Sequence, residues 1–205
     1  MKKTYVISVK LLSALHINGG TNADGTRITM KESRNGTEYP YIPASLFKGL
    51  LREHFARIWR DCIGKDTECS GRLNADEPCG CMVCKLFGSA GFQQSRIYLD
   101  RLQTTKTPHY ATRANVSINR YCRYKQDQAL VFSEVADRFD SNADSPDFTG
   151  EMTVHYPPQM SDAQRQCVEA VLIEAVQQIN CIGMGKSRGL GFVETQITEK
   201  EADAT

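Results

Sequence analysis

The sequence predicts an α+β protein with a βαββαβ core, the ferredoxin-like arrangement. Two segments far apart in the chain, residues 5–11 and 148–156, alternate apolar and polar side chains, which is typical of half-buried strands. Two others, residues 45–59 and 161–179, repeat apolar residues with helical spacing. Shorter strand-like segments before and after the second helix complete this order.

The first half of the chain supplies one strand and one helix. A turn-rich loop at residues 18–25 follows the first strand, which we place at residues 5–11. The helix begins after residues 40–43, because Pro-Tyr-Ile-Pro requires extended backbone. Lys48 and Arg52 lie one turn apart on its polar face. Its apolar face comprises Leu46, Leu50, Leu51, Phe55, Ile58 and Trp59.

The second half of the chain supplies the remaining elements. Residues 96–102 predict the second strand, and a long hairpin follows at about 104–132. Ser161 and Gln164 have the spacing of a capping box, which places the start of the second helix beside them. A glycine-rich loop, residues 183–191, precedes the last strand.

Length and composition indicate one soluble domain, residues 1–205. The chain has 25 Lys and Arg against 24 Asp and Glu, and its apolar share of 40% is ordinary for a globular protein. No apolar run approaches the ~18 residues of a membrane span. Ser8 and Lys10 interrupt any signal-peptide core at the N-terminus. We therefore expect a cytoplasmic protein without a membrane partner.

Five of the eight cysteines fall within 23 residues and predict a metal site. The candidate ligands are Cys69, Cys79, Cys81 and Cys84. Cys81 and Cys84 have the C-x-x-C spacing that brings two thiolates to one ion, and four protein ligands would make a closed, structural zinc site. Cys62 or His54 could replace Cys69, and a set of free thiols is the simpler alternative. Residues 61–90, which show no hydrophobic period, are interpreted as a cysteine-rich zinc insertion.

Two basic segments are candidates for binding a polyanion. Six Lys or Arg and no carboxylate occur between Arg101 and Lys125, although a solvated basic loop would have the same composition. In the glycine-rich loop, backbone amides could meet a phosphate chain while Lys186 and Arg188 neutralise it. A loose turn with incidental charge is the alternative for this loop.

Four segments in a fixed order resemble the RAMP superfamily, and more closely the repeated backbone subunit of type III CRISPR effector complexes. They are residues 15–20, 41–52, 81–88 and 183–191, and the resemblance extends from about residue 5 to 197. It implies a modified RNA-recognition-motif core. It also implies four kinds of partner: CRISPR guide RNA, target RNA, other effector subunits, and further copies or paralogues in a head-to-tail filament.

The resemblance assigns RNA contacts to three elements. The first helix would contact guide phosphates through Lys48 and Arg52. The hairpin at about 104–132 would be a thumb that inserts into the guide–target duplex. Its candidate contacts are Arg113 and Arg120, and those of the glycine-rich loop are Lys186 and Arg188.

The resemblance also implies an endoribonuclease activity. In cleaving members, an Asp in the loop after the first strand cuts target RNA with a divalent ion, Mg²⁺ or Mn²⁺, by attack of the ribose 2′-hydroxyl. Asp24 lies in that loop, although its local sequence by itself is more typical of a turn-forming residue, and Glu32 is the alternative carboxylate. A non-cleaving backbone subunit and a metal-independent RNA-processing RAMP enzyme remain as alternatives.

Overall fold

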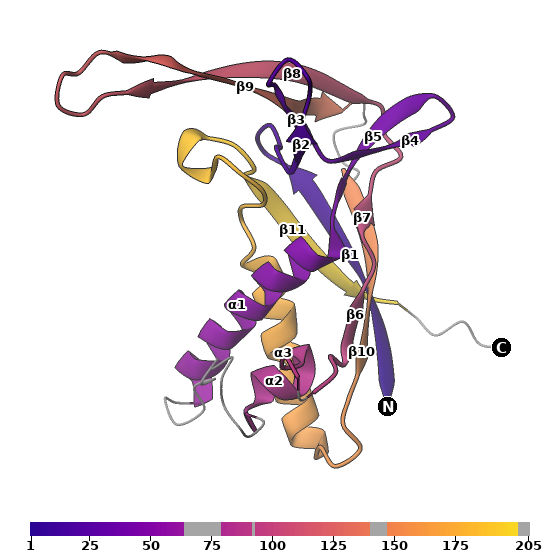
Figure 1. The fold of residues 1–205 in the computed structure, drawn as a ribbon. Helices are drawn as coiled ribbons and strands as arrows, with labels where there is room; N and C mark the ends of the chain where they lie inside the picture. The colour runs from indigo at the N-terminus through magenta and orange to yellow at the C-terminus, as the bar shows by residue number, and fades with distance from the viewer. Residues whose placement is uncertain (64–78, 92, 140–146, 201–205) are drawn as a thin grey trace.

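The main sheet of the protein has the strand order that the sequence predicts (Figure 1). The computed structural model describes residues 1–63, 79–91, 93–139 and 147–200. Strand β1 (Lys2–Leu11) pairs antiparallel with β11 (Val193–Glu199) on one side and with β10 (Phe148–His155) on the other. β10 pairs in turn with β6 (Ile97–Leu99) and β7 (Leu102–Gln103). Across the sheet the core strands therefore follow as last, first, third and second, which confirms the ferredoxin-like core.

Helices cover one face of this sheet. Helix α1 (Ala44–Ile63) lies in the chain between the core strands β1 and β6, and helix α3 (Asp162–Gln177) follows β10; both lie on the same side (Figure 1). The predicted capping box of α3 is confirmed, since the Ser161 hydroxyl accepts the Gln164 amide at 3.3 Å and the Gln164 side chain accepts the Ser161 amide at 3.2 Å.

The core forms where α1 crosses the inner face of the sheet. Four α1 side chains spaced four residues apart are buried: Phe47, Leu51, Phe55 and Trp59. The predicted helix is confirmed, but its buried stripe differs, because Leu46, Leu50 and Ile58 are only partly buried and Phe47 is fully buried. A spacing of four aligns side chains along one narrow seam, which here faces the sheet and α3.

The last part of the cysteine-rich insertion contributes to the main core. It forms helix α2 (Met82–Phe87), in which Val83, Leu86 and Phe87 are buried. The ring of Phe87 lies 5.5 Å from that of Phe55. The sequence did not predict α2, because a helix of six residues is too short to show a hydrophobic period.

A second sheet carries the predicted hairpin. Strands β8 (Pro108–Ile118) and β9 (Lys125–Phe139) form a long arm that projects from the body of the molecule (Figure 1). β3 (Arg27–Thr29) joins the base of β9, and β2 (Asn18–Thr21) pairs with β3. The hairpin agrees with the prediction but is longer, since β9 continues to Phe139.

The remaining strands extend the main sheet at its edge. β4 (Lys31–Arg34) and β5 (Thr37–Ile42) form a hairpin, and β5 pairs with β7. None of the helices in the described ranges is long and apolar enough to span a bilayer.

Candidate nucleic-acid interface and metal centre

Three of the four predicted metal ligands lie together at the start of α2. The sulfur atoms of Cys79, Cys81 and Cys84 all lie within 4.8 Å of one another. Zinc–sulfur bonds of about 2.3 Å place tetrahedral thiolates about 3.8 Å apart, a separation that lies within this limit. Cys69 lies outside the described residues. Among the residues that the structure describes, this is the one such group, and it includes neither Cys62 nor His54.

Local structure positions two of these thiols. The Cys81 sulfur caps α2 by accepting the Cys84 amide at 3.4 Å. The Cys84 side chain is buried, and the Arg52 guanidinium of α1 approaches its sulfur at 3.7 Å. A cation beside a thiol favours the thiolate, which is the form that binds metal. The three thiols can therefore hold a metal such as zinc.

The predicted RNA contacts on α1 are engaged with protein groups. Lys48 donates to the Ser95 hydroxyl at 2.6 Å and to the Ile97 carbonyl at 2.8 Å. Arg52 donates to the Gly88 carbonyl at 3.1 Å. Burial, and secondarily the charge of Arg52, lowers the pKa of Lys48. These two side chains thus brace α1 against the segment that follows α2.

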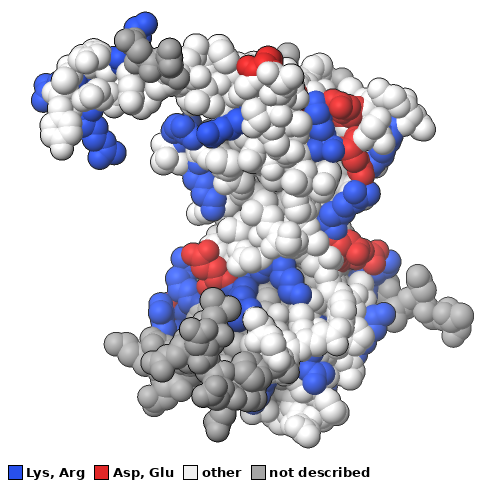
Figure 2. Space-filling model, in the orientation of Figure 1, with Lys and Arg blue, Asp and Glu red and all other residues white. Residues whose placement is uncertain are grey.

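The arm presents basic side chains to solvent. Arg113 on β8 and Arg120 at the tip are both exposed, and Figure 2 shows Lys and Arg side chains along the arm and on the body beneath it. At the tip, Asn119 accepts the amides of Tyr121 and Cys122, which closes the turn. Tyr121 is 96% exposed, so an aromatic ring is available beside the basic residues.

The glycine-rich loop holds its two basic residues in one tight turn. Lys186 and Arg188 lie in a single 3-10 turn flanked by Gly185 and Gly189, both with left-handed backbone. Glycine accommodates this conformation without steric cost. Both basic side chains are exposed, and the loop projects to the same side of the molecule as the arm (Figure 1).

Asp24 occupies the turn between β2 and β3. Its carboxylate accepts the Thr26 amide at 3.0 Å, while the Asn22 carbonyl accepts the Gly25 amide at 3.0 Å. The Asp24 side chain is exposed. Since β3 pairs with β9, this turn belongs to the same sheet as the arm. The structure therefore places Asp24 in the hairpin that joins the arm's base, with a turn-forming hydrogen bond.

The family model of the RAMP superfamily matches residues 8–194 of the chain. The chain belongs to the RAMP superfamily. No curated protein matches it. Membership identifies a CRISPR-associated RNA-binding protein whose partners are CRISPR RNA and effector-complex proteins. It confirms the resemblance at the level of the superfamily.

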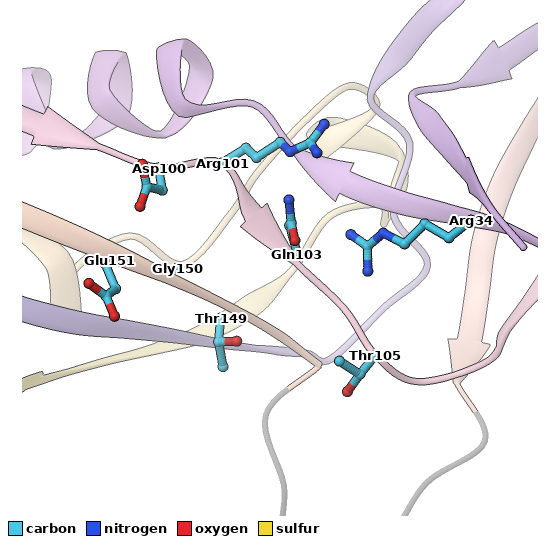
Figure 3. Close-up of a pocket in the computed structure, with 8 residues that line it drawn as sticks. All are labelled: Arg34, Asp100, Arg101, Gln103, Thr105, Thr149, Gly150 and Glu151. Atoms are coloured by element: carbon cyan, nitrogen blue, oxygen red, sulfur yellow. The ribbon is translucent and has the colours of Figure 1, made fainter.

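The alternative carboxylate of this RAMP protein, Glu32, is neutralised by two guanidinium groups. Arg34 and Arg101 both pair with it, the latter at 2.7 Å. The two arginines also line an open pocket of about 440 Å³ with residues of β7 and β10, where Arg34 points toward Gln103 (Figure 3). A carboxylate held by two cations is a poor ligand for a further cation. This arrangement favours Asp24 over Glu32 as the candidate catalytic group.

Sequence reasoning missed the residue that attaches the RAMP arm to the body. The Glu134 carboxylate accepts the Thr29 amide and the Lys31 ammonium group, each at 3.2 Å, and its carbonyl accepts His16 Nδ1–H at 2.7 Å. Glu134 thus connects β9 with β3, with β4 and with His16 in the segment that follows β1. In the sequence it is one acidic residue in an acidic stretch, so no local signal distinguishes it.

Proposed function

We propose that this protein is a guide-RNA-binding backbone subunit of a type III CRISPR ribonucleoprotein. The observation that carries the proposal is the basic arm, which extends from a RAMP domain on the same side as the basic glycine-rich loop. Guide RNA would contact Arg113 and Arg120 on the arm and Lys186 and Arg188 on the loop. Target RNA would pair with the guide, and neighbouring copies or other effector subunits would continue a head-to-tail filament.

The α1 residues have a smaller part in this proposal. Lys48 and Arg52 can add positive charge near the guide RNA. The protein acceptors that they already contact would, however, compete with its phosphates. We assign them chiefly to holding α1 against α2. Zinc bound by Cys79, Cys81, Cys84 and Cys69 would stabilise the same junction, because it would tie the insertion to the N-terminus of α2.

We further propose that the subunit cleaves target RNA and that Asp24 supplies the catalytic carboxylate. The carboxylate would orient the ribose 2′-hydroxyl and accept its proton. The 2′-oxygen then attacks the adjacent phosphorus, the bond from phosphorus to the 5′-oxygen breaks, a 2′,3′-cyclic phosphate forms, and the 5′-oxygen takes a proton from water. Mg²⁺ or Mn²⁺, when bound, would supply positive charge to the phosphate. The exposed position of Asp24 in the sheet that carries the arm supports this assignment.

A non-cleaving backbone subunit is the second candidate. The observation that favours it is the Asp24 hydrogen bond to Thr26, which a purely turn-forming aspartate would also make. Among the described residues, no group of three or more potential metal ligands includes Asp24.

Combined replacement of the four exposed basic residues is expected to abolish guide retention. The variant is Arg113→Ala, Arg120→Ala, Lys186→Ala and Arg188→Ala. Removing phosphate contacts should lower affinity for single-stranded RNA by about a hundredfold or more and make binding less dependent on salt. The measurement is RNA that co-purifies with the complex, together with a salt titration of binding. Lys2→Ala, a change at an exposed Lys far from the arm, is the control; an equal loss there, or no loss in the fourfold variant, argues against the interface.

Asp24→Ala is expected to reduce target cleavage by about a hundredfold with guide and target binding intact, because general-base catalysis contributes on that scale. Product formation is measured in the assembled complex with Mg²⁺ or Mn²⁺, and Glu32→Gln should cleave normally. Unchanged cleavage in the Asp24 variant would remove Asp24 from the mechanism. Absence of cleavage in the wild type would support the non-cleaving subunit, and cleavage that resists EDTA would support a processing enzyme.

A further inference from the structure

The face of the main sheet away from the helices carries a pair of aromatic side chains. Tyr98 lies on β6, and His155 ends β10. Their neighbours Ile97 and Val154 are buried on the helix-covered side. Because side chains alternate along a strand, Tyr98 and His155 belong to the opposite, open face. Tyr98 is 50% exposed.

Local contacts hold the Tyr98 ring in place. Its centroid lies 5.3 Å from that of His155 in an edge-to-face arrangement with an interplanar angle of 75°. The Gln94 side-chain amide donates to the Tyr98 hydroxyl at 3.3 Å. The ring is therefore supported at its hydroxyl and by a second ring. A ring held in this way can offer its face to a flat ligand at little entropic cost.

A cavity of about 340 Å³ adjoins this pair. Its lining residues are Gln93, Gln94, Ser95, Arg96, Tyr98 and His155. The lining offers an aromatic surface for stacking, amides that can both donate and accept hydrogen bonds, and one guanidinium group. It includes no carboxylate. Single-stranded RNA is recognised by this combination, in which bases stack on aromatic rings and hydrogen-bond at their edges.

The neighbouring part of the open face limits the length of such a ligand. Asp100, which lies between β6 and β7, and Glu151 on β10 line the pocket of Figure 3. Lys200 pairs with Glu151 at 2.6 Å. The lining of that pocket includes Arg34 and Arg101 as well as these carboxylates, but no aromatic side chain, so a second base would find no ring to stack on there. The chemistry fits one or two nucleotides at the β6–β10 end.

We propose that the cavity beside Tyr98 and His155 binds an unpaired base of single-stranded RNA. The base stacks on Tyr98, the Gln93 and Gln94 amides meet its edge, and Arg96 contacts an adjoining phosphate. The proposed RNA-binding function supplies the class of ligand, but this cavity is separate from the arm and the glycine-rich loop and binds through different residues.

A crosslinking experiment locates the base. Full-length protein is irradiated with a short single-stranded oligonucleotide that contains 4-thiouridine, digested with trypsin and analysed by mass spectrometry. Cleavage after Arg96 and Arg101 isolates the peptide Ile97–Arg101, which contains Tyr98 as its one aromatic residue. The expected result is a crosslink on this peptide. Its persistence in the fourfold arm-and-loop variant is expected too, because those residues do not line the cavity.

Affinity measurements test the stacking contact. Tyr98→Ala should weaken binding of the oligonucleotide to the fourfold variant about tenfold, whereas Tyr98→Phe, which keeps the ring, should stay within about twofold. Gln196→Ala, on β11 of the same sheet, is the control. Crosslinks confined to the arm and loop would overturn this inference and leave the proposed function standing. Crosslinks confined to Ile97–Arg101 would support this inference and argue against the RNA contacts proposed for the arm and loop. Equal binding by the fourfold variant with and without Tyr98→Ala would also overturn it.

Discussion

Gly191→Ala is expected to lower the free energy of unfolding by about 4 kcal/mol or more, on the scale of the most damaging single substitutions. A Cβ atom at this position would overlap the carbonyl oxygen of Ile182. That backbone cannot move aside, because Ile182 donates to the Gly191 carbonyl at 2.8 Å and Gly191 donates to Ala14 at 2.9 Å. The φ angle of +75° adds strain for any residue with a side chain. Urea denaturation of wild type and variant measures the difference.

Gly189→Ala is the matched control for this prediction. Gly189 lies in the same loop and has a similar φ of +79°, but nothing lies within 4 Å of a Cβ atom there. The Gly189→Ala substitution should lower the free energy of unfolding by about 1 kcal/mol, the penalty for left-handed backbone alone. Equal effects of the two substitutions would mean that the close approach to Ile182 does not stabilise the loop. A larger effect at Gly191 would show that backbone packing holds the turn of Lys186 and Arg188 in place.

Cys84→Ser is expected to remove bound zinc and to destabilise the protein by about 3–5 kcal/mol, because the folding of small metal sites depends on the metal. Cys84 is 2% exposed and lies in α2, whose other buried residues pack into the main core. Loss of the metal should therefore loosen the contact between α2 and α1 as well as the insertion. Metal content by elemental analysis and thermal unfolding measure the two effects, and EDTA treatment of wild type should reproduce them.

Cys122→Ser provides the control for the zinc prediction. Cys122 is exposed at the tip of the arm, far from α2 in the chain. This variant should keep both its zinc and its stability. Protein that contains no stoichiometric zinc, and a Cys84→Ser variant as stable as wild type, would together refute the metal centre.

The predictable parts of the fold are those that depend on neighbouring residues along the chain. The alternation of Tyr5, Ile7 and Val9 predicts a strand buried on one face, and the structure agrees. The capping box of α3 and the turn in which Asp24 accepts the Thr26 amide are local as well. Both form as their residues favour. Helix α2 was missed because it is too short to show a period, and its packing partner Phe55 lies far away in the sequence.

The candidate sites divide along the same line. By itself, the sequence determined the class of the core, the C-x-x-C pair and the basic character of the arm and loop, because periodicity, ligand spacing and charge are properties of short segments. Only the tertiary structure decided which charges are engaged. It turned Lys48 toward Ile97 and paired Glu32 with Arg101. It also brought Tyr98 beside His155. Partners distant in the chain meet only when the sheet pairs and the helices pack, so their electrostatics cannot be predicted from local sequence.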